Sequence, residues 1–78
     1  MRELLEFLIR SLVDNPELVA IEERAAEGAT VMRVRVAGSD IGKVIGRQGR
    51  TIKAIRALMT AAEPRLGQKA VVELAEDE

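Results

Sequence analysis

The residues best suited to bind a ligand lie in residues 41–52, which read Ile-Gly-Lys-Val-Ile-Gly-Arg-Gln-Gly-Arg-Thr-Ile. Gly46 and Gly49 bracket Arg47 and Gln48, so both shoulders of the predicted turn lack side chains. Such a turn exposes its backbone amides, Arg47 adds a permanent positive charge, and a helix starting after the turn directs its N-terminal dipole toward an anion. The spacing therefore predicts a bare, cationic turn that suits a phosphate chain.

Helices are expected on both sides of this turn. Ile41, Val44 and Ile45 recur at i, i+3 and i+4, which places them on one face of a short helix. Ser39 precedes this helix, and its hydroxyl can accept a free amide of the first turn as a cap. A longer helix is expected from residue 50 to about residue 62.

Missing residue types exclude several kinds of chemistry. The chain has no cysteine and no histidine, so disulfides, thiolate sites, the commonest metal ligand and the commonest general base are all absent. Catalysis would need a carboxylate pair or an activated lysine, and no constellation of residues suggests either. We therefore expect no enzymatic activity, no metal and no cofactor.

The length predicts one small domain that spans residues 1–78. No apolar run approaches the roughly 18–20 residues needed to cross a membrane. Glu3 and Glu6 interrupt the apolar N-terminus, which argues against a signal peptide. We expect an intracellular, cytoplasmic protein.

The distribution of charge is more informative than its sum. The formal net charge is −1, yet residues 32–56 hold seven basic residues and one acidic residue, Asp40. The basic residues are Arg33, Arg35, Lys43, Arg47, Arg50, Lys53 and Arg56. A local basic patch attracts phosphate even when the whole chain is slightly acidic. This predicts a positive field concentrated around the glycine turn.

Apolar periodicity predicts the remaining elements. A first helix is expected at residues 2–13, and a break follows at 14–17. Strands are expected at 18–24, 30–36 and 69–75. Residues 76–78 are expected to form a frayed acidic end. A turn is expected at 25–29, and Pro64 and Gly67 are expected to end the long helix. The residues expected to face the core are Leu4, Leu5, Leu8 and Leu12, widened by Phe7, Ile9 and Val13; Val19 and Ile21; Met32, Val34 and Val36; Ile52, Ile55, Met59 and Ala62; and Ala70, Val72 and Leu74.

The element order is αββααβ. The first two strands form an antiparallel hairpin, whereas the second and third are joined through a pair of helices, which predicts a right-handed crossover and a parallel pair. The expected fold is therefore α+β, a three-stranded mixed sheet with helices packed on one face.

With this element order around it, the glycine turn resembles that of a known family. Residues 41–52 match the signature I-G-x-x-I-G-x-x-G-x-x-I of the K-homology (KH) domain at every fixed position, and αββααβ resembles its type II arrangement. KH modules clamp about four nucleotides of single strand with a G-x-x-G loop. The leucine-rich first helix, which ends Leu-Val-Asp-Asn-Pro-Glu at residues 12–17, together with the single KH unit, is similar to the small bacterial KH proteins of the KhpA family.

This resemblance implies a site for single-stranded RNA. The turn would lie against the sugar-phosphate backbone, aliphatic residues of the short helix would form one wall of a narrow groove, and the middle strand near residues 32–36 would form the other wall. The implied site residues are Gly46, Arg47, Gln48, Gly49, Arg50, Lys43, Ile41, Val44, Ile45 and Lys53. The only aromatic residue is Phe7, which argues against the stacking platforms of RRM and OB folds.

The resemblance also implies a biological setting. Members of the family are similar to RNA chaperones or post-transcriptional regulators that act with a larger KH-containing partner, KhpB. They are linked to cell shape and cell-wall homeostasis.

The long helix predicts self-association. Ala54, Ala57 and Ala61 form a smooth, uncharged strip beside Leu58, and small residues allow another helix to approach closely. Exposed apolar area of this kind marks contact surfaces, so we expect a homodimer, or a heterodimer with a second KH protein. The alternative is that packing against the first helix covers Leu58 and Met59.

Three other functions are less favoured by the sequence. A helix-turn-helix DNA reader also joins two helices by a glycine-containing turn, but its first helix would here be only about two turns long and would hold Gly42. A KH fold that serves only as a dimerisation scaffold is disfavoured because Arg47 and Arg50 are present and no acidic residue lies in the turn. An enzyme is the least favoured.

Overall fold

The computed structural model describes residues 2–75, so the predicted acidic end at 76–78 lies outside the described residues. The elements are α1 (Arg2–Leu12), β1 (Ala20–Ala26), β2 (Ala29–Arg35), α2 (Ile41–Ile45), α3 (Arg50–Leu66) and β3 (Lys69–Ala75). Short 3-10 turns at Pro16–Leu18, Gly38–Asp40 and Arg47–Gly49 connect them. The predicted αββααβ order is confirmed, although β1 begins at Ala20 rather than at residue 18 because the turn after Pro16 includes Leu18.

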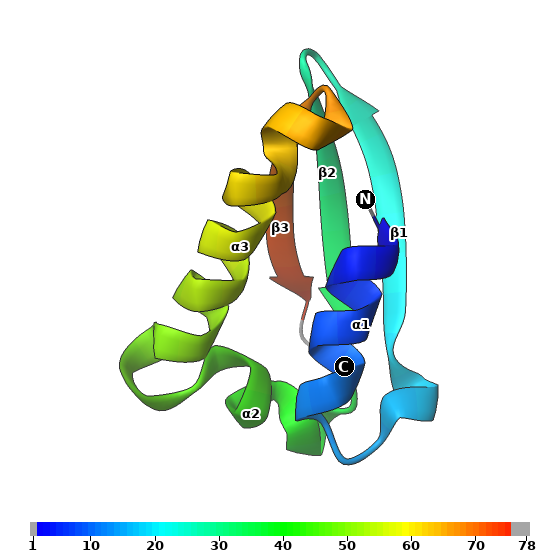
Figure 1. Cartoon of the computed structure of the whole chain (residues 1–78). Helices are drawn as coiled ribbons and strands as arrows, with labels where there is room; N and C mark the ends of the chain where they lie inside the picture. The colour runs from blue at the N-terminus through cyan, green and yellow to red at the C-terminus, as the bar shows by residue number, and fades with distance from the viewer. Residues whose placement is uncertain (1, 76–78) are drawn as a thin grey trace.

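The sheet has the predicted mixed topology, with β2 between β1 and β3. β1 and β2 are antiparallel and are joined by a tight turn in which Gly28 takes a φ of 71°. β2 and β3 are parallel because α2 and α3 carry the chain from the end of one strand back to the start of the next. The helices lie on one face of the sheet and leave the other face open (Figure 1).

Period-two alternation in β2 places the core beneath the helices. Met32, Val34 and, just beyond the strand, Val36 are buried, while Arg33 and Arg35 are exposed on the other face. Ile52, Ile55 and Met59 of α3 pack onto this apolar surface at helical spacing. The remaining core residues are Leu5, Ile9, Val19, Ile21, Val44 and Val72.

The predicted leucine stripe on the first helix is partly wrong in phase. α1 buries Leu5 and Ile9 completely, whereas Leu4 and Leu12 are each 39% exposed and Phe7 is 69% exposed. Apolar residues occur around most of this helix, so periodicity alone does not fix which line of them meets the sheet. The tertiary contact selects the line through Leu5 and Ile9, which are one turn apart.

The long helix extends further than predicted. α3 continues through Pro64 to Leu66 and ends where Gly67 takes a φ of 78° and donates its amide to the Glu63 carbonyl, 2.9 Å away. Proline in the last turns removes one helical hydrogen bond without stopping the helix here. The prediction that Gly67 ends the helix is confirmed, whereas the prediction that Pro64 ends it is wrong.

Within residues 2–75, no helix has both the length and the apolar character that a membrane crossing requires.

Candidate nucleic-acid interface

The two glycines of the turn serve different purposes. We call residues 46–50 the glycine corner. Gly46 has a φ of 75°, and a Cβ on it would lie 2.7 Å from Cβ and 2.9 Å from the backbone nitrogen of Thr51. Gly49 has a φ of 74°, but the nearest atom to its Cβ would be Cε of Lys53 at 3.9 Å. Gly46 therefore supplies both backbone conformation and close approach to α3, while Gly49 supplies conformation.

The backbone between these glycines is open to a ligand. Gln48 has a φ of 57°, so three residues of the corner adopt positive φ. The Gly49 amide donates to the Gly46 carbonyl at 3.1 Å. Among residues 2–75, the Arg47 and Gln48 amides donate no hydrogen bond. Two free donors beside the start of α3 can bind an anionic oxygen.

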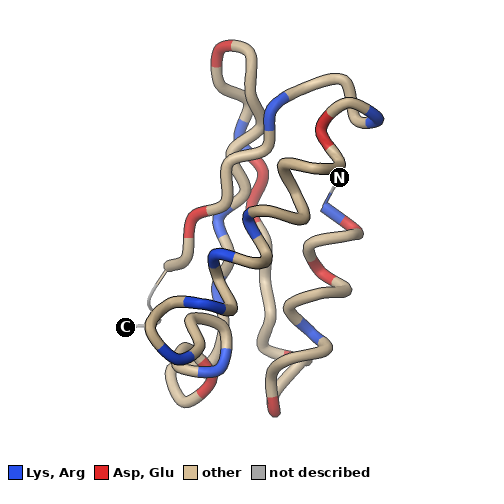
Figure 2. The backbone as a smooth tube through the Cα atoms, turned by 60° about the vertical axis from the view of Figure 1, so that its left-hand side comes forward, with Lys and Arg blue, Asp and Glu red and all other residues tan. Residues whose placement is uncertain are grey.

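Three cations surround these free amides. Arg47, Arg50 and Lys53 are exposed, and none of them forms an ion pair with a described carboxylate. Within the described part of the chain, the Arg50 guanidinium donates to the side-chain oxygen of Gln48 alone, at 3.4 Å. Figure 2 shows this concentration of Lys and Arg at the turn between α2 and α3 and along the adjoining part of α3. The corner thus combines free donors with positive charge that no described carboxylate pairs with.

The other predicted cations lie away from the corner or contact other groups. Arg33 and Arg35 lie on the open face of the sheet, and Arg35 pairs with Glu22 at 3.7 Å. The Arg56 guanidinium donates twice to the Val72 carbonyl, at 3.3 Å each. The predicted field of seven cations around the turn is therefore corrected to a smaller one, because strand alternation places Arg33 and Arg35 on the open face. Arg56 keeps its positive charge, but its guanidinium is directed to the edge of β3.

Lys43 is also engaged, although it lies in α2 just ahead of the corner. Its Nζ is 3.1 Å from Oδ2 of Asp14 and 3.7 Å from Oδ1 of Asp40. The hydrogen bond and the charge of Asp14 are the main causes that raise the pKa of the Lys43 ammonium. Its positive charge is thus balanced by two carboxylates, unlike those of the corner.

The aliphatic residues of α2 do not act as one wall. Val44 is fully buried in the core, so the implied role for it as a groove-lining residue is corrected: its side chain belongs to the hydrophobic core cluster. Ile41 is half-buried against the same core, and Ile45 remains 37% exposed beside the corner. Ser39 is exposed within a 3-10 turn and does not cap α2, because Asp40 occupies the residue before the helix.

Gly42 extends the bare surface of the corner along α2. It is exposed, its φ is not positive, and a Cβ on it would meet no atom within 4 Å. The Gly46 amide donates to the Gly42 carbonyl at 2.9 Å, so the two glycines lie one turn apart on the same helix. Neither backbone conformation nor packing requires glycine at residue 42.

The implied second wall is also corrected. β2 is the central strand and its apolar side chains contribute to the core, whereas β3 is an edge strand and packs beside α3 (Figure 1). Glu63 accepts the outward-facing Ala70 amide at 2.8 Å, and Arg56 binds the outward-facing Val72 carbonyl. By the same alternation, Leu74 directs its backbone groups to this edge. A ligand on the corner would therefore be bounded by β3.

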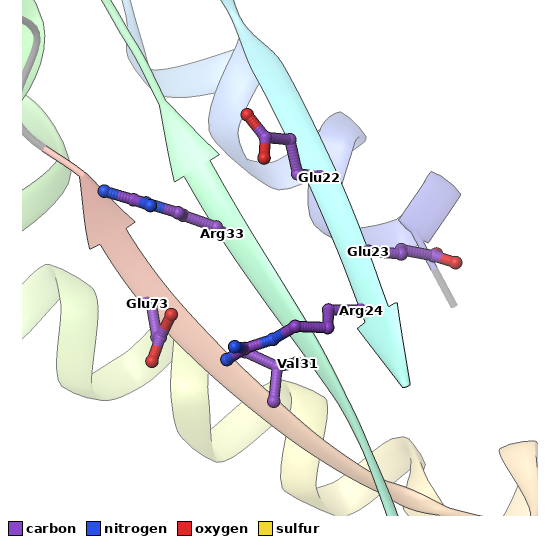
Figure 3. Close-up of a pocket in the computed structure, with 6 residues that line it drawn as sticks. All are labelled: Glu22, Glu23, Arg24, Val31, Arg33 and Glu73. Atoms are coloured by element: carbon purple, nitrogen blue, oxygen red, sulfur yellow. The ribbon is translucent and has the colours of Figure 1, made fainter. Parts of the chain in front are cut away.

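A second candidate site lies on the open face of the sheet, in a shallow hollow of about 160 Å³ (Figure 3). Its lining residues come from all three strands and are Glu22, Glu23, Arg24, Val31, Arg33 and Glu73. Glu22 and Glu73 flank Arg33 on neighbouring strands, and Figure 3 shows the arginine lying between them. This mixture of charges does not favour phosphate. Among residues 2–75, no group of acidic residues is placed to hold a metal ion.

Sequence reasoning missed the role of Asp40. This aspartate is fully buried, and its carboxylate accepts hydrogen bonds from Asp14 and Asn15, about 25 residues earlier in the chain. The only signal in the sequence was an acidic residue inside an otherwise basic segment. That signal does not identify a partner so far away.

The αββααβ fold, with a G-x-x-G corner between the two crossover helices, defines a KH domain. A sequence model described as the KH domain of KhpA/KhpB matches residues 2–74. The chain belongs to this family.

Curated relatives cover nearly the whole chain. RNA-binding protein KhpA of Clostridium perfringens is 45% identical over 95% of this chain and 99% of the relative. Its namesake from Chlamydia caviae is 43% identical over 99% of both chains. The protein of the same name from Aquifex aeolicus is 36% identical over 97% of this chain and 96% of the relative.

Proposed function

We propose that the protein binds single-stranded RNA through the glycine corner. One observation carries the proposal: the free amides of Arg47 and Gln48 lie among three cations that no described carboxylate neutralises. Phosphate oxygens need such donors and such charge. The relatives named RNA-binding protein KhpA support RNA as the ligand.

Single strands are favoured over duplexes because of what surrounds the corner. Ile45 offers an exposed aliphatic surface, and Gly42 leaves the helix beside it bare. Unpaired bases can pack on such a surface, whereas the bases of a duplex are already stacked and paired. Gly46, Arg47, Gln48, Gly49 and Arg50 would meet the backbone, and Ile41, Ile45 and Lys53 would border the bases.

This proposal is tested by measuring affinity for a short single-stranded RNA and for a duplex of the same sequence by fluorescence anisotropy. We expect weak binding that prefers the single strand. Because few phosphates are met, log K should fall against log salt with a slope of about −2 to −3. Preferential binding of the duplex would instead favour the helix-turn-helix alternative, and no binding of either RNA would favour a scaffold.

The proposal extends to a setting that the family resemblance supports. The protein would act in the cytoplasm as an RNA chaperone or post-transcriptional regulator, without catalysis, together with a larger KhpB-like protein that also contains a KH domain. Its effects would reach cell shape and cell-wall homeostasis. Deleting the gene and profiling both cell shape and RNA co-purified with the tagged protein would test this; normal shape together with no enriched RNA would contradict it.

We further propose that α3 mediates a homodimer, or a heterodimer with that KH partner. Leu58 is 52% exposed, and Ala54, Ala57 and Ala61 are exposed beside it, so packing within the chain leaves this strip uncovered. A dimer would present two corners to one RNA and raise the effective affinity. Sedimentation equilibrium should show dimers that Leu58→Glu dissociates. A wild type that stays monomeric at micromolar concentrations would rule out the homodimer.

A further inference from the structure

The Asp40 carboxylate joins two segments that are distant in sequence. Its Oδ1 accepts the backbone amide of Asp14 at 3.2 Å, and its Oδ2 accepts the backbone amide and the side-chain amide of Asn15 at 3.0 and 3.1 Å. The residue has no exposed surface. The start of α2 is therefore tied to the connection between α1 and β1.

Lys43 closes the outer side of this cluster through its ion pairs with Asp14 and Asp40. Burial alone raises the pKa of the Asp40 carboxyl, but the hydrogen bonds from Asn15 and Asp14 and the charge of Lys43 outweigh it and lower this pKa below its usual value. The carboxylate is thus ionised at neutral pH and fully hydrogen-bonded.

The position of Asp40 makes this tie unusual. An aspartate immediately before a helix ordinarily caps it by accepting an amide of the first turn. Asp40 occupies that position but forms no such bond with α2. Its carboxylate oxygens instead accept hydrogen bonds from Asp14 and Asn15, so the carboxylate fixes the helix to another part of the chain.

α2 depends on external contacts of this kind. It has five residues, too few for a helix to be stable by itself, and only Val44 among them is buried. Gly46 fixes its far end against Thr51. Asp40 fixes its near end, and the corner follows directly.

We propose that Asp40 is a positioning residue for RNA binding, which holds α2 and thereby presents the glycine corner in the geometry that the ligand meets. This inference rests on the proposed function. Asp40 is buried and touches no ligand, and its removal leaves Arg47, Arg50 and Lys53 in place. Its loss should therefore weaken binding without changing the charge that the corner offers.

The test is Asp40→Asn, in which an amide group replaces one of the two acceptor oxygens and faces backbone donors. We expect affinity for single-stranded RNA to fall by about tenfold, measured where circular dichroism shows the variant fully folded. The slope of log K against log salt should stay at the wild-type value, because no phosphate-binding cation is lost. Backbone amide resonances of residues 46–49 should shift in the absence of RNA.

Asp14→Asn is the matched control. It keeps the backbone amide that Asp40 accepts and removes only the exposed partner of Lys43, so affinity should stay within about twofold of wild type. If Asp40→Asn does not fold, Asn15→Ala removes one hydrogen bond to Asp40 and should weaken binding by about threefold.

A folded Asp40→Asn or Asn15→Ala protein with wild-type affinity and unshifted corner resonances would overturn the proposal. An affinity loss of the same size in Asp14→Asn would assign the effect to the ion pair with Lys43 instead of to the Asp40 hydrogen bonds. Failure of the wild type to bind RNA would contradict the proposed function, whereas the corner resonances without RNA test the positioning role separately.

Discussion

The glycine corner, with Lys53 beside it, and the open face of the sheet both carry exposed cations, yet they differ in what surrounds those cations. At the corner, Arg47, Arg50 and Lys53 have no described carboxylate partner. On the sheet, Arg24, Arg33 and Arg35 alternate with Glu22 and Glu73 across neighbouring strands. Residue type alone therefore does not identify a phosphate site; the neighbours decide whether a cation is available to a ligand.

Screening explains why this local difference matters more than the net charge of −1. At physiological salt, exposed charges interact strongly only within about 8 Å. Glutamates on adjacent strands fall within this range of the sheet arginines, so they cancel much of the field there. At the corner, no described carboxylate pairs with Arg47, Arg50 or Lys53, and free amides accompany their positive charge.

The largest expected effect on binding comes from reversing the charge of the corner. Arg47→Asp with Gln48→Asp should weaken single-strand RNA binding by about 30-fold or more, since two carboxylates then face phosphate. Both side chains are accessible at the corner, and aspartate tolerates the positive φ of Gln48, so circular dichroism should show an unchanged fold.

The matched control for this variant lies on the sheet. Arg24→Asp with Ala20→Asp changes the net charge by the same amount on exposed positions of β1. Affinity should remain within about twofold of wild type. Equal losses in the two variants would show that only the total charge matters, and the distinction between the surfaces would fail.

The two glycines of the corner provide a comparison of conformational effects. Gly46→Ala should lower the free energy of unfolding by about 2–4 kcal/mol, because a strained φ is combined with a clash against Thr51. Gly49→Ala incurs only the conformational strain, about 1–2 kcal/mol. Urea denaturation measures both; equal values would contradict the close approach of Gly46 to α3.

The smallest expected effect concerns Gly42, where stability and binding should change in opposite directions. Gly42→Ala should raise the free energy of unfolding by about 0.5–1 kcal/mol, because alanine favours helix and its Cβ meets nothing. RNA affinity should nevertheless fall by about threefold, since the methyl group covers surface beside the corner. Gly38→Ala, whose Cβ is equally unobstructed, is the control. Unchanged affinity in Gly42→Ala would limit the binding surface to residues 46–50.

Much of the fold was predictable because it depends on local patterns. Alternation in β2, helical spacing in α3 and the crossover between β2 and β3 predicted the topology, and the glycine spacing predicted the corner. Each of these signals lies within one element or between consecutive elements. The family match and the curated relatives agree with the predicted family.

What sequence reasoning missed depends on contacts between distant residues. Val44 and Ile45 are adjacent in sequence, and only the packing of α2 against the rest of the fold determines that the first is buried and the second exposed. The sequence did not show that Arg56 directs its guanidinium to a backbone carbonyl of β3, 16 residues later in the chain. The role of Asp40 depends on hydrogen bonds from residues 25 and 26 positions earlier in the chain. Periodicity and composition contain none of this information.

The most direct test of the central claim is a titration of the ¹⁵N-labelled protein with a short single-stranded RNA, followed by amide chemical shifts. Binding at the glycine corner predicts that the largest changes fall on residues 46–50, with smaller ones at Gly42, Lys53 and Leu74. The amides of Glu22, Arg33 and Glu73 on the open sheet face should stay unchanged. If the largest chemical-shift changes fell on that face and the amides of residues 46–50 did not shift, the account would be contradicted.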